Sequence, residues 1–185
     1  MSNHIYSTAA AGKLFGLKTI GVIRGYAHLP LTPTLAYAKA QIAARNPLPI
    51  AGTAFLSVRD QDKEPLVAVA RSLAGQGFDL VGTRGTAEYL SRAGLDVQTV
   101  NKVSEGRPNG EDLIINGKID LIINTPLGSQ SVADEYRLRQ AAIAYRVPVL
   151  TTISAARAAT QAIAELQAGL LSVKSLQEYA DVGRG

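Results

Sequence analysis

The sequence contains no cysteine, no tryptophan and only two histidines among its 185 residues. Without cysteine the chain forms no disulfide and no thiolate zinc site, and this composition fits a reducing compartment. His4 and His28 both precede the regular part of the sequence, so a Ser-His-Asp triad or a histidine-rich metal site has no evident source there. The commonest hydrolase and zinc chemistries are therefore unsupported.

Long uncharged apolar segments are also missing, because Lys, Arg, Asp or Glu interrupts every hydrophobic run. A transmembrane helix needs about 20 consecutive apolar residues, and residues 1–11 lack the pattern of a secretory signal. We therefore expect a cytoplasmic protein with no membrane partner. The net charge is +4, but the basic residues are scattered. This charge distribution favours a small anionic ligand over nucleic acid.

A regular alternation of strand-like and helix-like segments begins at about residue 52. The expected strands cover residues 53–59, 78–83, 95–100, 118–125 and 147–152. Between and after them come expected helices at 60–77, 86–94, 111–117, 131–146 and 153–169. The alternation predicts an α/β fold, in which helices flank a doubly wound, Rossmann-like parallel sheet of five strands. We expect residues 1–51 to form a leader and linker with one helix at 35–44, and residues 52–185 to form the domain.

Small hydroxyl, amide and Lys side chains come directly after the expected strands. Because the carboxyl ends of parallel strands meet at one edge of a sheet, we expect these side chains to lie close together. Helix N-termini at that edge favour an anion, so the pattern predicts a phosphate-binding site. The residues concerned are Lys63, Thr83, Gly85, Thr86, Lys102, Asn124, Thr125, Gly128 and Ser129.

Each of these residues also has a simpler structural interpretation. A Thr before a helix is commonly only an N-cap, and Lys63 would be a solvated Lys paired with a nearby carboxylate. Yet a cation in the first turn of a helix opposes the helix dipole, and a bound anion would remove this conflict. Lys102 would be a solvated surface residue, and the segment 124–129 a turn that caps the next helix.

No known catalytic motif accompanies these residues. Neither G-x-G-x-x-G nor a P-loop occurs, because Gly12-Lys13 lacks the upstream glycine and the following Ser or Thr. Carboxylates at the expected helix starts are candidate general bases, although such carboxylates are usually caps. They include Glu105, Glu111, Asp112, Asp134 and Glu135.

Several segments occur in an order and spacing that resemble a known family. They are AYAKAQIAA, PLPIAGTAFLSVRDQDK, GFDLVGTRGTAEYLSRAG, VNKVSEGRPN and LIINTPLG. From about residue 35 onward the sequence is similar to the C-terminal part of the carbamoyl phosphate synthetase large subunit, a methylglyoxal-synthase-like allosteric domain. The resemblance implies a non-catalytic regulatory module that binds a nucleotide effector such as UMP or IMP. Residues 1–34 do not share it.

The resemblance also implies a role for individual residues. Lys63, Thr83 and Thr86 would hold the phosphate, whereas Lys102, Asn124 and Thr125 would contact the ribose and the base. Two positions depart from the family, because Pro126 replaces a second Thr, and Val149 replaces the Tyr that contacts ornithine in some members. Thr151 remains as a residue for a second effector.

The resemblance implies no cofactor in this domain, but ATP and Mg or Mn for the parent enzyme. It also implies two kinds of protein partner, namely the remaining synthetase domains and the small glutaminase subunit. A stand-alone lyase acting on dihydroxyacetone phosphate is the alternative, since methylglyoxal synthases have a similar phosphate site. Those enzymes use an Asp in a G-G-D loop and a His after a D-P-L turn. Here the loop reads NGED, and Val132 lies about where the His would be.

Overall fold

The computed structural model describes residues 37–38, 41, 47–126 and 132–169. All of them belong to one unit of the chain, Pro33–Leu170, while the other unit, Met1–Thr32 with Leu171–Gly185, lies outside the described residues. Of the helix expected at 35–44, the described residues Tyr37, Ala38 and Gln41 are helical. The rest of that helix lies outside the described residues.

Five parallel strands form one sheet in the order β3-β2-β1-β4-β5. The strands are β1 (Gly52–Ser57), β2 (Phe78–Thr83), β3 (Gln98–Val100), β4 (Leu121–Asn124) and β5 (Val149–Leu150). The chain adds β2 and β3 on one side of β1, and then β4 and β5 on the other side. This topology confirms the predicted doubly wound sheet, and in such sheets the point where the order reverses is the usual ligand site.

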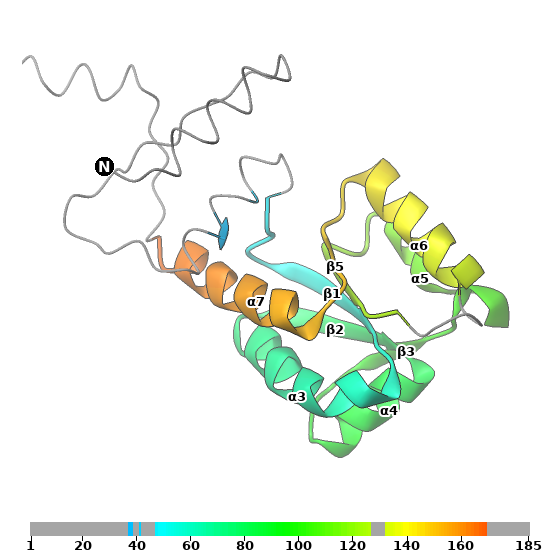
Figure 1. Cartoon of the computed structure of the whole chain (residues 1–185), viewed down its shortest axis with the longest axis horizontal. Coiled ribbons are helices and arrows are strands. Elements are labelled where there is room, and N and C mark those ends of the chain that lie inside the picture. Colours follow the sequence, from blue (N-terminus) through cyan, green and yellow to red (C-terminus); the bar gives the residue numbers. More distant parts are fainter. Residues whose placement is uncertain (1–36, 39–40, 42–46, 127–131, 170–185) are drawn as a thin grey trace, which may run out of the picture. The chain divides into compact units, whose positions relative to one another are not determined.

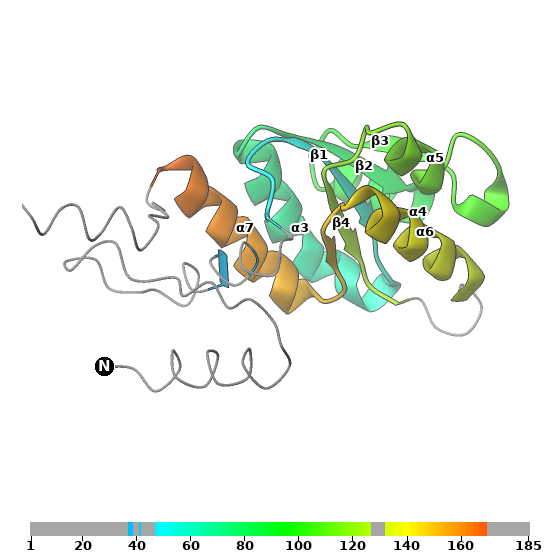
Figure 2. The ribbon, with the colours of Figure 1, turned by 90° about the horizontal axis from the view of Figure 1, so that it is seen from above.

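Helices cover both faces of the sheet (Figures 1 and 2). One face carries α3 (Asp60–Gly75), α4 (Arg84–Arg92) and α7 (Ile153–Gln167), and the other carries α5 (Gly110–Ile115) and α6 (Val132–Tyr145). A short 3-10 helix, η1 (Val103–Glu105), follows β3. No helix among the described residues is long and apolar enough to cross a membrane.

The first, fourth and fifth strands end earlier than the sequence pattern predicted, whereas the second and third end at the predicted residues. We expected the first strand to run to Arg59, but β1 ends at Ser57, because α3 begins three residues later. Likewise, the strand expected at 147–152 is only Val149–Leu150. The shorter β1 places Ser57 at the carboxyl edge of the sheet.

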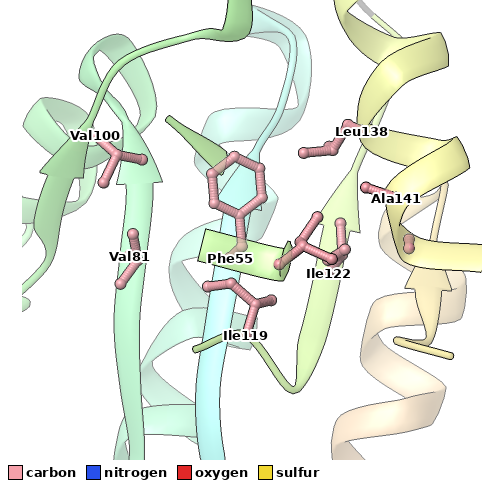
Figure 3. Close-up of a cluster of buried hydrophobic side chains, with 9 residues drawn as sticks. Phe55, Val81, Val100, Ile119, Ile122, Leu138 and Ala141 are labelled. Carbon is pink, nitrogen blue, oxygen red and sulfur yellow. The ribbon is translucent and has the colours of Figure 1, made fainter. Parts of the chain in front are cut away.

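The core on the α5 and α6 face also positions the candidate site. Phe55, Val81 and Ile122 come from three adjacent strands and pack beneath Leu138 and Ala141 of α6 (Figure 3). Side chains alternate between the faces of a strand, so the residue two positions further along each strand lies on the same face. These residues are Ser57, Thr83 and Asn124, the last residues of β1, β2 and β4.

Candidate functional site

A pocket opens at the carboxyl edge of the sheet, on the face covered by α5 and α6. Its floor contains Ser57, Thr83 and Asn124, which are all less than 7% exposed. The other lining residues are Phe55, Asn101, Lys102, Val103, Gly110, Asp134, Glu135 and Leu138. The structure thus brings together residues from three strands and from the loops that follow them.

Buried hydroxyl groups form a connected cluster at the floor of this pocket. The Thr83 hydroxyl donates to the Ser57 hydroxyl at 3.3 Å and lies 3.5 Å from the Thr86 hydroxyl. Thr83 is the N-cap residue of α4, but its side chain makes no capping hydrogen bond. Thr83 therefore occupies the predicted N-cap position without capping the helix, and its side chain supplies no partner for the first N–H groups of α4.

Lys63 reaches from α3 to the first turn of α4. A Cβ atom added to Gly85 would lie 3.3 Å from the Lys63 Nζ atom, so the absence of a side chain there makes room for the ammonium group. The ammonium pairs with Asp60 Oδ1 at 2.7 Å, yet the Lys63 side chain is only 19% exposed. Lys63 therefore has the expected carboxylate partner but is not a solvated surface residue. It is a partly buried cation beside the N-terminus of a helix.

Lys102 adds a second positive charge at the same edge. It lies in the pocket with Thr83, and its charge also acts on Asp60. The hydrogen bond from Lys63 lowers the pKa of the Asp60 carboxyl, and the positive charges of Lys63 and Lys102 lower this pKa further. The ammonium groups of Lys63 and Lys102 therefore both lie close enough to the Asp60 carboxylate to stabilise its negative charge.

The two residues after the fourth strand have different surroundings. Asn124 is 4% exposed and lines the pocket. Thr125 is 1% exposed, and its hydroxyl accepts a hydrogen bond at 3.2 Å from the backbone N–H of Arg59. Thr86 has a similar role, since its hydroxyl accepts at 3.3 Å from the N–H of Val58. Both Thr hydroxyls hold the turn between β1 and α3, and each still has a proton to donate.

Among the predicted site residues, Thr83, Lys102 and Asn124 line this pocket. Four others are not lining residues, namely Lys63, Gly85, Thr86 and Thr125. Gly128 and Ser129 lie outside the described residues. Thr151 is exposed and lines a different pocket, which lies beside β5 and the end of α6 and includes Arg139 and Arg146. The structure therefore separates the residue predicted for a second effector from those predicted for the nucleotide.

The sequence interpretation did not assign most of the lining residues to the site, and Ser57 and Asn101 are the polar ones that it missed. Ser57 was hidden inside a strand that we expected to continue to Arg59, although its place near a strand end was a usable signal. Asp134 and Glu135 were named only as candidate general bases or helix caps, and both line the pocket. Asp134 accepts a hydrogen bond at 2.6 Å from the hydroxyl of Ser104, which ties η1 to the first turn of α6.

The other helix-start carboxylates have structural partners. The Asp112 carboxylate accepts a hydrogen bond at 3.1 Å from the N–H of Asn109 and completes a capping box, as expected for such a residue. Glu111 pairs with Arg137 of α6 at 2.5 Å, and Glu105 accepts from the N–H of Lys102 at 3.1 Å. Within the described part of the chain, no group of three or more His, Cys, Asp or Glu residues could hold a metal ion.

Comparison with known proteins shows the family to which this sheet and its helices belong. The family model "MGS-like domain" matches residues 65–151, which extend from the second turn of α3 to the residue after β5. This part of the chain belongs to the MGS-like domain family. The match confirms the resemblance in the sequence and agrees with the observed sheet of five parallel strands flanked by helices.

Curated relatives of the MGS-like chain include large chains of carbamoyl phosphate synthase. The chain is 48% identical to that of Methanosarcina mazei over 145 residues and 43% identical to that of Myxococcus xanthus over 166 residues. These alignments cover 78% and 90% of this chain, but only 14% and 15% of the relatives. The chain therefore spans about one seventh of the length of these relatives.

A shorter relative shows which end of the large chain is similar. This protein, "Carbamoyl phosphate synthase large chain, C-terminal section" of Methanopyrus kandleri, is 49% identical over 148 residues, which are 80% of this chain and 27% of that protein. Among solved structures, methylglyoxal synthase from Elizabethkingia anophelis NUHP1 is 20% identical with a TM-score of 0.48, and the match covers 60% of this chain and 77% of that chain.

Proposed function

We propose that this MGS-like domain is the nucleotide-binding regulatory domain of a glutamine-hydrolysing carbamoyl phosphate synthase. Its ligand is a nucleoside monophosphate of the UMP or IMP type. In this role the domain controls the synthesis of carbamoyl phosphate for pyrimidine and arginine biosynthesis. The similarity to carbamoyl phosphate synthase large chains supports the parent enzyme, and the pocket supports the class of ligand.

The single observation that carries this proposal is the position of Lys63. Its ammonium lies against Gly85 in the first turn of α4. Thr83 and Thr86, which lie on either side of Gly85 in the sequence, have hydroxyls 3.5 Å apart. Uncapped N–H groups, the partial positive charge of a helix N-terminus and a partly buried Lys together favour a phosphate oxygen. In the structure without a ligand, the Asp60 carboxylate supplies the negative charge beside Lys63.

The rest of the pocket suits a nucleoside. Asn124 offers both a donor and an acceptor, Lys102 is a donor, and the carboxylate of Asp134 is an acceptor for ribose hydroxyls or base N–H groups. Phe55 and Leu138 provide an apolar wall. A polar end for the phosphate and a mixed wall for the nucleoside are typical of small-molecule pockets.

Regulation requires more than binding. The nucleotide must bind one state of the parent enzyme more tightly than the other, because equal affinity would shift no equilibrium. The proposed partners in that equilibrium are the remaining synthetase domains, which use ATP and Mg or Mn, and the small glutaminase subunit. Thr151, which lies outside the nucleotide pocket, remains the residue proposed for a second effector.

Calorimetric titration with UMP and IMP tests the proposal. We expect at least one nucleotide to bind with a Kd below 1 mM, and Lys63→Ala to weaken its binding roughly tenfold or more, since a charge-assisted hydrogen bond is lost. Lys118→Ala is the matched control, because Lys118 is an exposed Lys that lies before β4 rather than at the carboxyl edge. Equal losses in the two variants, or no binding to the wild type, would show that the site is assigned wrongly.

A lyase that acts on dihydroxyacetone phosphate is the second candidate function. Asp134 and Glu135 favour it, since they place two carboxylates in a phosphate pocket where one could abstract a proton. Asp112 of the NGED loop does not favour it, because its carboxylate is held in the α5 capping box. A coupled assay for methylglyoxal distinguishes the two functions, and clear turnover would overturn the regulatory proposal.

A further inference from the structure

We propose that Asp60 selects the anion that binds at Lys63, beside the N-terminus of α4, by competing with it for the ammonium group, so that a dianionic phosphate monoester is accepted and monoanions are disfavoured. This inference rests on the proposed function, because it requires Lys63 to be the residue that binds the phosphate. In this role Asp60 does not contact the ligand. It determines which anions can displace its own carboxylate from Lys63.

The geometry of the ion pair makes Asp60 a replaceable partner. Asp60 Oδ1 lies 2.7 Å from the Lys63 Nζ atom, but the two side chains differ greatly in exposure, at 93% for Asp60 and 19% for Lys63. When Asp60 is displaced, its carboxylate returns to water without a desolvation cost. The ammonium is held against Gly85 and cannot be hydrated in the same way. An incoming anion therefore takes the place of Asp60 at a fixed cation.

The charge of the incoming anion decides whether the exchange is favourable. A monoanion gives Lys63 only what the carboxylate already supplied, so little free energy is gained. A phosphate monoester carries a charge of about −1.5 to −2 at pH 7, and its second charge also interacts with Lys102 and the N-terminus of α4. The pKa of Asp60 is lowered by both lysines, so this competitor stays ionised at neutral pH.

The first turn of α3 contains a matched control for Asp60. Asp62 lies two residues away on the same helix, but its carboxylate pairs with Arg59 at 2.8 Å rather than with Lys63. Asp60→Asn and Asp62→Asn therefore remove the same charge from the same helix turn. Only the first substitution releases the ammonium of Lys63.

The experiment is a calorimetric titration at constant ionic strength with two probes. One probe is UMP, a dianion, and the other is UMP methylated on its phosphate, a monoanion. We expect the wild type to prefer UMP. We expect Asp60→Asn to bind the methyl ester roughly 1.5 to 5 times more tightly, the range for release of one exposed ion pair, and to lose part of the preference for UMP. Asp62→Asn should leave the preference unchanged.

Two further variants separate the possible failures. In a Lys63→Ala background, Asp60→Asn should not tighten the binding of the methyl ester, because the ammonium group for which the two anions compete is absent. If Lys63→Ala weakens UMP binding but Asp60→Asn behaves like Asp62→Asn, the role of Asp60 is wrong and the proposed function stands. If Lys63→Ala leaves UMP binding unaltered, the phosphate assignment is wrong, and the role of Asp60 is overturned with it.

Discussion

Two of the predicted site residues hold the backbone at the end of β1. The hydroxyls of Thr86 and Thr125 accept hydrogen bonds from the N–H groups of Val58 and Arg59, and so fix the turn that leads into α3. Replacing either Thr would therefore change stability and binding together. Gly85 is a better probe, because it affects the site only through the space that it leaves for Lys63.

Gly85→Ala should weaken nucleotide binding without weakening the fold. The new Cβ would lie 3.3 Å from the Lys63 Nζ atom, so the ammonium must move by a few tenths of an ångström. We expect a loss in affinity of roughly three- to tenfold, part of the value of one charge-assisted hydrogen bond. Because Ala is a better helix former than Gly, the free energy of unfolding should stay equal or rise by up to about 1 kcal/mol.

The measurements for Gly85→Ala are calorimetric titration with UMP and thermal unfolding without ligand. A fall in thermal stability that parallels the fall in affinity would contradict this role of Gly85. So would an unchanged affinity.

Capping divides the helices into two groups. In α5 and α7, the side chains of Asn109 and Thr152 accept hydrogen bonds from backbone N–H groups at 3.1 Å. The N-cap residues of α3 and α4, Arg59 and Thr83, make no such bond. The two uncapped N-termini are those of the helices that contain or contact Lys63. Their free backbone N–H groups can donate to an anion bound at this edge.

Arg146, which follows α6, should gain stability when replaced by glycine. Its φ is 58°, the left-handed conformation in which a side chain costs about 1 kcal/mol or more. We expect Arg146→Gly to raise the free energy of unfolding by roughly 0.5–1 kcal/mol in urea unfolding, since glycine is more flexible in the unfolded chain and this offsets part of the gain. Arg146→Ala is the control, because it removes the same side chain but keeps the strain. A gain that is equal in both variants would attribute the effect to charge rather than to backbone conformation.

In the domain as a whole, the core and the pocket share side chains. Phe55 and Leu138 belong to the buried cluster between the sheet and α6, and they also line the pocket. Gly110, the first residue of α5, packs against both of them. The pocket is therefore one end of the hydrophobic core rather than a separate surface feature.

Gly110→Ala should damage both stability and binding. A Cβ atom there would lie 2.8 Å from Phe55 Cζ and 3.0 Å from Leu138 Cδ1, and overpacking of this kind costs about 1–3 kcal/mol. We expect a lower urea midpoint and weaker binding of UMP, because Phe55 must shift. Gly75→Ala is the control, since no atom lies within 4 Å of its added Cβ, and its stability should be equal or higher. Equal stability of the two variants would contradict the prediction, because it would show that Phe55 and Leu138 can shift at little cost in free energy.

The sequence predicted the fold well because the signals for it are local. Strand and helix periods, together with the alternation of the two, identify the parallel sheet, its five strands and the five α-helices described within residues 52–126 and 132–169, but not the 3-10 helix η1. Boundaries were less predictable. The end of β1 is followed by a turn in which the N–H groups of Val58 and Arg59 donate to Thr86 and Thr125, which are distant in sequence, and for this reason Ser57 was missed.

By itself, the sequence determined that the residues after the strands would reach one edge of a parallel sheet, since the alternation of strands and helices predicts parallel strands. The order of the strands came only from the structure. Only the tertiary structure decided what each residue does there. It showed that Thr83 bonds to Ser57 instead of capping α4, that Lys63 is paired with Asp60 yet mostly buried, and that Thr151 lies apart. The physical reason is that burial and hydrogen-bond partners depend on contacts between distant segments, which no local pattern records.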